Sequence, residues 1–265
     1  MKVFISADIE GTAFTTYWDE TEKGKQGYER AAAEMTREVR AAVDGAMAAG
    51  ATEIVVNDAH DSGTNIDPNA MPACVTLIRG WSGSPMSMVD GVDESFDAAM
   101  FVGWHAAAGR CGNPLSHTMS IKAWRITLNG LPCSEFLLYS WACAMVGVPT
   151  VLLTGDQTLV RDSRSLHPCL QTVAVKDGLG GLTRCMSPER AEAEIRAAAE
   201  AALRQDLAAA RITLPERFDL SITFKEHRNA VRAGFYPGMA RVDDSTVTFK
   251  TDSLTEVLRA VWFVM

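Results

Sequence analysis

Residues able to bind a metal ion follow three short apolar segments of this 265-residue chain. Asp8 and Glu10 follow residues 2–7, His60 follows residues 53–57 and His105 follows residues 98–103. The carboxyl ends of strands in an open parallel sheet line one crevice, so these side chains are expected to converge. Carboxylates and imidazoles together are the ligand set of Zn²⁺ or a similar divalent ion. An aspartate shared by two ions would make this a two-metal site.

Glu135 is a further candidate ligand on independent grounds. It is the only charged residue between Arg125 and Asp156, and it opens a predicted helix of apolar and small residues. A lone carboxylate in such surroundings is costly to bury unless it is paired or coordinates a cation. A metal ion would compensate that cost.

Each candidate also has an ordinary structural interpretation. Asp8 could be a turn residue after a strand, and Glu135 could favour a helix N-terminus. His60 or His105 alone would more often be a hydrogen-bonded structural histidine. Taken singly, the structural interpretations are favoured by about two to one. Taken together, three strand ends that share one ligand chemistry favour a metal site.

The remaining histidines and the glycine-rich segment are less specific. His117 could be another ligand, an acid–base group or an exposed loop residue, whereas His167 and His227 are interpreted as surface residues. The segment 178–181 does not match G-x-G-x-x-G, and the chain has neither a P-loop motif nor the G-x-S-x-G elbow of serine hydrolases. Nucleotide binding and a serine nucleophile are therefore unsupported.

The composition excludes other classes of function. The chain has 25 basic and 33 acidic side chains, a net charge of −8, which argues against a nucleic-acid or anionic-membrane partner. No continuous apolar run reaches the roughly 18–20 residues of a spanning helix, because Gly147 and Pro149 break the nearest uncharged stretch, residues 136–154. The N-terminus lacks the pattern of a signal peptide, and six cysteines occur without C-x-x-C spacing. These features predict reduced thiols and a cytoplasmic location.

The elements that would position the candidate ligands alternate between strand and helix. Short apolar runs separated by helices predict an α/β fold with a mostly parallel central sheet flanked by helices. A 3.6-residue apolar period predicts a helix over residues 28–50, and Ser187 with Pro188 predicts the start of another. Asn129-Gly130 predicts a hairpin after a strand over residues 123–128.

The last part of the chain has a different pattern. Apolar and polar residues alternate over 218–224, a strand-like pattern surrounds Asp243-Asp244, and residues 252–264 resemble a closing helix. We therefore expect an α/β metal-binding catalytic domain over 1–211 and a smaller C-terminal α+β subdomain or sheet extension over 212–265.

The motifs, in this order and spacing, resemble those of the DppA-type zinc-dependent D-aminopeptidases. The likeness extends over most of the chain and fades in the C-terminal part. The motifs that carry it are Asp-Ile-Glu-Gly at 8–11, Asn-Asp-Ala-His at 57–60, Met-Val-Asp-Gly-Val-Asp at 88–93, Gly-Trp-His-Ala at 103–106, Ser-His at 116–117 and Glu135.

The resemblance implies two zinc ions per subunit on an α/β fold. It implies that Asp8 bridges the ions, that Glu10 and His60 bind one of them, that His105 and Glu135 bind the other, and that His117 is catalytic. It further implies a decamer of two stacked five-membered rings. The implied substrates are short peptides with an N-terminal D-amino acid, notably D-alanine.

The resemblance leads to a mechanistic hypothesis and leaves alternatives open. A hydroxide that bridges the two ions would attack the carbonyl of the N-terminal peptide bond. His117 would then pass a proton to the leaving amine or stabilise the tetrahedral intermediate. The same metal site could instead act on L-aminoacyl peptides or another small amide. A non-catalytic, metabolite-binding α/β protein is the alternative from a different class.

Overall fold

The seven-stranded sheet at the centre of the molecule places the carboxyl ends of its strands along one edge. A computed structural model describes residues 1–167 and 169–265. In the order β3-β2-β1-β4-β7-β8-β9, neighbouring strands are parallel except for the last pair. The strands are β1 (Lys2–Ala7), β2 (Glu53–Asp58), β3 (Val75–Ile78), β4 (Ala98–Trp104), β7 (Thr150–Asp156), β8 (Gln171–Leu179) and β9 (Leu182–Cys185).

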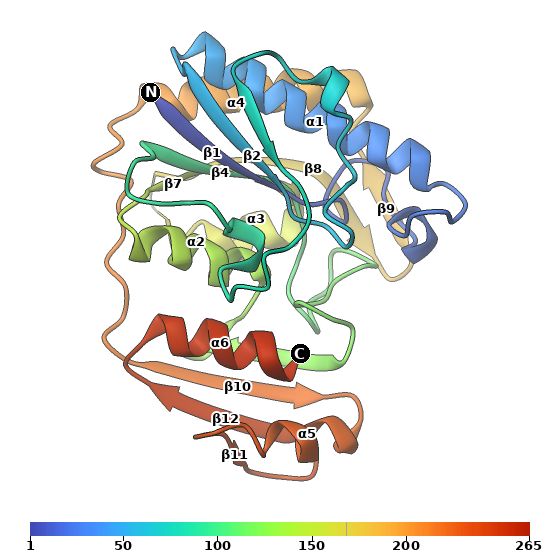
Figure 1. Ribbon diagram of the computed structural model, residues 1–265. Helices are drawn as coiled ribbons and strands as arrows, with labels where there is room; N and C mark the ends of the chain where they lie inside the picture. Colours follow the sequence, from blue (N-terminus) through green and yellow to red (C-terminus); the bar gives the residue numbers. More distant parts are fainter. Residues whose placement is uncertain (168) are drawn as a thin grey trace.

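Helices cover both faces of this sheet, as Figure 1 shows. Helices α1 (Tyr28–Ala48) and α4 (Pro188–Arg204) pack against each other on one face. Helices α2 (Glu135–Met145) and α3 (Gln157–Ser163) lie on the other face. Because both faces are covered, the central strands β1, β4 and β7 are buried along almost their whole length.

A second, antiparallel sheet brings the middle of the chain together with its C-terminal part. Its strand order is β11-β12-β10-β5-β6, so the hairpin predicted at Asn129-Gly130 pairs with strands from beyond residue 217. Helix α6 lies between this sheet and α2 (Figure 1). The elements are β5 (Ala123–Leu128), β6 (Leu131–Pro132), β10 (Phe218–Phe224), α5 (His227–Ala233), β11 (Ala240–Arg241), β12 (Thr246–Thr251) and α6 (Leu254–Val264).

The architecture confirms the predicted fold class, a mostly parallel sheet between helices with a smaller α+β part. The division of the chain near residue 212 stays a prediction. Three short 3₁₀ helices, at Trp18–Glu20, Pro68–Ala70 and Ser87–Val89, complete the elements among the described residues.

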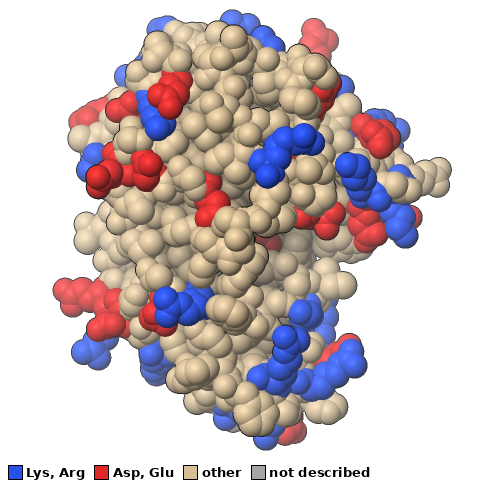
Figure 2. Space-filling model, viewed as in Figure 1, with Lys and Arg blue, Asp and Glu red and all other residues tan. Residues whose placement is uncertain are grey.

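Apolar packing on each face of the central sheet holds the strand ends in place. One core joins α1 and α4 to that sheet, and a second lies between that sheet, α2 and the antiparallel sheet. Across the described ranges, no helix combines the length and apolar character needed to cross a membrane. Charged side chains of both signs are dispersed over the face drawn in Figure 2.

Candidate metal centre

The five predicted ligands come together at the carboxyl ends of three adjacent strands. Asp8 and Glu10 follow β1, His60 lies two residues beyond β2, and His105 follows β4 directly. Glu135 reaches the same place from the first turn of α2, where Ser134 caps the helix by accepting a hydrogen bond from the Leu137 amide. The relative exposure of each of the five is 7% or less.

Asp8 lies between two halves of this cluster. Its Oδ1 is 3.2 Å from His60 Nδ1, and its Oδ2 is 3.4 Å from His105 Nε2. Glu10 Oε2 lies 3.0 Å from His60 Nδ1 on one side. Glu135 Oε2 lies 3.3 Å from His105 Nε2 on the other. One carboxylate oxygen of Asp8 therefore faces each half, which is the arrangement that a bridging ligand requires.

Backbone carbonyls orient both histidines of the cluster. His60 Nε2 lies 2.8 Å from the Thr21 carbonyl oxygen, and His105 Nδ1 lies 3.0 Å from that of Ala106. Each imidazole can donate a proton there, which leaves the lone pair of its other nitrogen directed at the carboxylates. Metal-binding histidines are held in this way, because the outer hydrogen bond fixes the tautomer and the ring orientation.

Several polar atoms at the centre of the cluster are buried without a hydrogen bond. Among the described residues, Asp8 Oδ2, Glu10 Oε2 and His105 Nε2 have no partner with acceptable geometry, although they lie close to other ligand atoms. Burying polar atoms without a hydrogen bond is unfavourable, so each of these orphaned atoms calls for a compensating group. Their convergence on shared points fits divalent cations, and the donor set of three carboxylates and two imidazoles suits zinc.

The electrostatics of the cluster also demand positive charge. Burial lowers the pKa of His105, but the carboxylates of Glu135, Asp8 and Glu10 together outweigh burial and raise this pKa to about 10. Burial likewise opposes protonation of His60, yet Glu10 and Asp8 raise its pKa well above its ordinary value. Both imidazoles are thus driven to bind a proton by the surrounding carboxylates. A metal ion satisfies the same demand and leaves the imidazoles neutral, as ligands must be.

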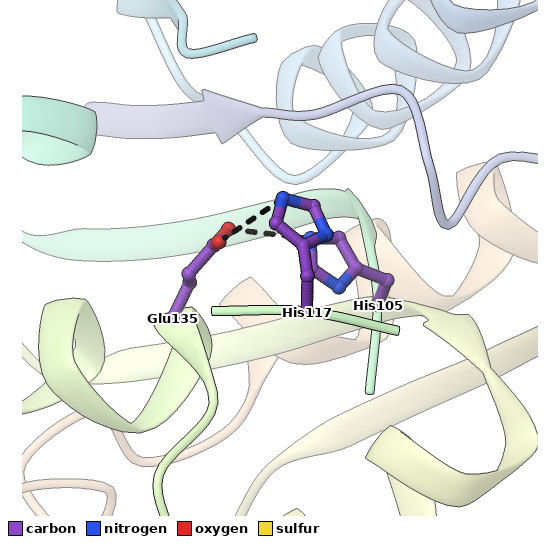
Figure 3. Close-up of side chains that lie close together, drawn as sticks. All are labelled: His105, His117 and Glu135. Carbon is purple, nitrogen blue, oxygen red and sulfur yellow. Dashed lines mark ion pairs between the residues drawn. The ribbon is translucent and has the colours of Figure 1, made fainter. Parts of the chain in front are cut away.

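His117 lies against the same half of the cluster as Glu135. Its ring stacks on that of His105, with centroids 4.3 Å apart, and its Nε2 is 3.6 Å from Glu135 Oε1 (Figure 3). His117 Nδ1 lies 2.9 Å from the Leu115 carbonyl oxygen, so Nδ1 donates and Nε2 faces Glu135 with its lone pair. Burial and the neighbouring His105 lower the pKa of His117. The ring is therefore neutral near pH 7 and able to accept a proton.

Comparison with known proteins gives the same picture over the whole chain. The sequence profile of the D-aminopeptidase family, peptidase family M55, matches residues 1–263. The D-aminopeptidase of Bacillus subtilis (strain 168) is 30% identical over 263 residues, which are 98% of this chain and 95% of that protein.

The chain belongs to the D-aminopeptidase family.

A solved structure agrees with this membership. The Zn-dependent D-aminopeptidase DppA from Bacillus subtilis, described as a self-compartmentalizing protease, superposes with a TM-score of 0.91. That comparison has 29% sequence identity and covers 100% of this chain and 96% of that one. The family resemblance and the peptidase class inferred from the sequence are confirmed.

Buried polar side chains next to the candidate metal centre hold the backbone of the segments that carry the predicted ligands. Lys176 on β8 donates hydrogen bonds to the carbonyl oxygens of Glu10 and Thr15. Asn113 donates to the Glu10 carbonyl oxygen at 2.9 Å and to the Asp156 carboxylate at 3.2 Å. Asp156 in turn accepts from the Ala106 amide at 2.7 Å, next to His105. The network therefore ties the segment that carries Glu10 to the segment that carries His105.

Tight backbone contact between the same segments leaves room only for glycine. Gly103 has a φ of +77° and its Cα lies against the carbonyl group of Asp8. Gly11 packs directly on the Trp104 carbonyl, and its amide donates to the Gly103 oxygen at 2.7 Å. These contacts fix the spacing between the end of β1 and the end of β4.

A cavity of about 470 Å³ opens onto the metal centre. It is bounded on one side by Asp8, Glu10, His60, His117 and Glu135, and on the others by Trp18, Thr21, Glu22, Ala59, Asp61, Trp81, Ser87, Met88, Met119, Ile121 and Trp262. A peptide could therefore reach the cluster from solvent.

Sequence reasoning missed several of these features. It placed His167 on the surface, but His167 is 2% exposed, because its ring packs on α2: it meets Phe136 with centroids 5.5 Å apart, and its Nε2 lies 3.1 Å from the Ser140 hydroxyl. His227 is exposed, as expected. The supports Lys176 and Asn113 were not singled out. Lys176 gave one usable signal, a lysine within the otherwise apolar segment 173–176.

Proposed function

We propose that this chain is a two-zinc aminopeptidase that hydrolyses the N-terminal peptide bond of short peptides beginning with a D-amino acid. The observation that carries the proposal is the position of Asp8, with one carboxylate oxygen toward each half of the ligand cluster. Membership of the D-aminopeptidase family and the zinc dependence of the structural relative support it.

The residues would divide between two ions about the shared Asp8. Glu10 and His60 would hold one ion, and His105 and Glu135 would hold the other. Bound zinc would supply Lewis-acid chemistry, lowering the pKa of coordinated water and polarising the scissile carbonyl. The protein contributes rigid geometry, since the ligands leave ordered strand ends and their outer atoms are fixed by backbone hydrogen bonds.

His117 is placed to manage the proton that hydrolysis transfers. Its Nδ1–H is committed to the Leu115 carbonyl, so only Nε2, which faces Glu135, exchanges a proton. A neutral Nε2 first accepts a proton as the peptide carbonyl is attacked. It then passes the proton to the leaving amine, which needs it to depart as a neutral group. Trp18 holds the ring from the side, with centroids 5.3 Å apart.

The proposal includes an oligomeric state and a location. The description of the structural relative as self-compartmentalizing supports an assembly that encloses the active sites, and we propose the decamer of two stacked pentameric rings that the resemblance implies. A cytoplasmic location accords with six cysteines that are all free among the described residues.

Metal analysis combined with peptide hydrolysis tests the proposal. We expect two zinc ions per chain, cleavage of D-Ala-D-Ala in preference to L-Ala-L-Ala, and loss of both metal and activity after chelation. His60→Ala and Glu135→Ala should each remove one ion and lower kcat at least 100-fold. His227→Ala, which changes an exposed histidine on α5, is the matched control and should match the wild type. Full turnover with one zinc per chain would refute the two-ion scheme.

A further inference from the structure

Large apolar side chains gather around the cavity that leads to the metal centre. Their presence is not explained by metal binding or by the proton transfer assigned to His117. They come from four separate parts of the chain, namely Trp18, Trp81, Met88, Met119, Ile121 and Trp262.

Three of these side chains are exposed to solvent although they are strongly apolar. Trp18 and Trp81 are each 38% exposed, and Ile121 is 58% exposed. Scattered apolar residues are normal on a protein surface, but these line one concave site beside a candidate catalytic centre. Apolar and aromatic lining with a few convergent polar groups is typical of a ligand pocket. Covering these surfaces with an apolar group would be favourable.

Both exposed indoles are held in position before any ligand binds. The Trp81 indole N–H donates to the Asp61 carbonyl oxygen at 2.6 Å. Trp18 meets His117 edge to face, with an interplanar angle of 70°. Rings fixed in this way lose little freedom on binding, so contact with them contributes more fully to affinity.

The charged groups of the cavity indicate which end of a peptide lies where. Glu22 and Asp61 line it in addition to the candidate ligands, and no lysine or arginine does so among the residues that the structure describes. The negative charge of Asp61 therefore complements the N-terminal ammonium group of a peptide. Because the Asp61 carbonyl oxygen accepts the hydrogen bond of the Trp81 indole, Trp81 lies on the same side of the cavity. Trp18 contacts His117, the residue assigned to the leaving amine, and so lies beyond the scissile bond.

We propose that this enzyme selects peptides with large apolar, preferably aromatic, side chains on both sides of the scissile bond. The inference rests on the proposed function and adds a specificity that alanine peptides do not use. Trp81 contacts the side chain of the N-terminal residue, and Trp18 contacts that of the residue after it. A methyl group covers little of either indole, whereas an aromatic side chain buries 150–250 Å².

Ratios of kcat/KM between paired substrates test the two contacts separately. D-Phe-D-Ala against D-Ala-D-Ala reports the N-terminal position, and D-Ala-D-Phe against D-Ala-D-Ala reports the second. We expect each ratio to exceed about 10 in the wild type, since small differences in an apolar pocket already give 10–200-fold discrimination. A general loss of catalysis in a variant cancels from such a ratio.

Three tryptophan variants make the test specific. Trp81→Ala should bring the first ratio toward 1 and leave the second unchanged, and Trp18→Ala should do the reverse. Trp124→Ala is the control, because Trp124 is 59% exposed but lies outside this cavity, and it should change neither ratio. Wild-type ratios at or below 1, or ratios that Trp81→Ala and Trp18→Ala do not lower, would overturn the proposal.

Failure of this inference can be told apart from failure of the proposed function. If the zinc-loaded enzyme cleaves D-Ala-D-Ala but shows no preference for phenylalanine, only the specificity is wrong. If it cleaves no peptide, the proposed function is wrong. In that case the inference is tested by comparing the rise in Tm that free D-phenylalanine causes with the rise that free D-alanine causes, because binding of an amino acid needs no turnover. A larger rise with D-phenylalanine, abolished in Trp81→Ala, supports it, and equal rises overturn it.

Discussion

Substituting Gly11 by alanine would separate the two strand ends that carry the candidate ligands. Gly11 follows Glu10 and packs on the carbonyl of Trp104, the residue before His105. A methyl carbon placed on Gly11 would lie 1.9 Å from that oxygen, and heavy atoms in proteins essentially never approach a Cβ within 3.0 Å. The obstacle is backbone on both sides, so no side-chain rotation relieves it.

The size of the effect follows from this overlap. The two segments must move apart by about 1 Å, whereas catalytic and metal-binding groups need their positions held to about 0.5 Å. A displacement of about 1 Å costs on the order of 100-fold in rate. Overpacking of this kind also lowers the free energy of unfolding by about 1–3 kcal/mol. We expect Gly11→Ala to bind zinc 10–100-fold more weakly and to lose about 99% of its kcat.

Two other glycines provide controls for the assay, which combines zinc competition with a chelator and urea denaturation. Gly45→Ala overlaps the Arg196 carbonyl where α1 packs on α4, far from the metal centre, and should lower stability without weakening zinc binding. Gly181→Ala places its methyl in open space and should change neither quantity. If Gly11→Ala binds zinc as tightly as Gly45→Ala does, strand spacing does not control the site and the reasoning is refuted.

Three further predictions follow from the buried groups. Chelation should lower the Tm, because the orphaned atoms of Asp8 and His105 lose their compensating charge, and an unchanged Tm would contradict the metal site. Lys176→Met should weaken zinc binding 10–100-fold through release of the Glu10 carbonyl, which the same chelator competition measures; wild-type affinity would show that this support is dispensable. Burial raises the pKa of Glu38 to about 8 from an ordinary value of 4.5. The folded state therefore keeps a proton that the unfolded state releases, and the free energy of unfolding falls as pH rises from about 5 to 8. In Glu38→Gln, the free energy of unfolding measured by urea denaturation should fall less between about pH 5 and 8 than in the wild type. Plots of this free energy against pH that run parallel for the two proteins would contradict the prediction.

Strand ends made much of the cluster predictable from the sequence. Asp8, His60 and His105 each follow a continuous apolar run, and buried parallel strands end on a common edge. Glu135 was recognisable because it is the one charge in a long uncharged stretch. Both signals depend only on the local sequence pattern and on general sheet topology, so they can be recognised without knowledge of the tertiary contacts.

Long-range contacts explain what the sequence did not reveal. Lys176 and Asn113 donate hydrogen bonds to the Glu10 carbonyl oxygen from positions more than 100 residues away in the sequence. Every residue has a backbone carbonyl, so the residue type at position 10 does not indicate which side chains bond to it. The pairing of β5 with β10 was not predicted for a similar reason, since the sequence of neither strand specifies its distant partner. Trp18 opens a short 3₁₀ helix and Trp81 lies in a loop. The course of both segments depends on the whole fold, so the sequence alone does not predict that the two side chains line one cavity.

The charge balance of the cluster favours the proposed two ions over a single ion. When they act as ligands, Asp8, Glu10 and Glu135 are deprotonated and bring three negative charges into a buried site, whereas the imidazoles beside them are neutral. One divalent ion would leave a net negative site that repels the charge developing on a peptide carbonyl oxygen. Before hydroxide binds, two divalent ions would leave one positive charge in surroundings that exclude much of the water, where electrostatic stabilisation of that oxygen is strongest. The charge balance of the three carboxylates therefore supports the proposed occupancy of both halves of the cluster.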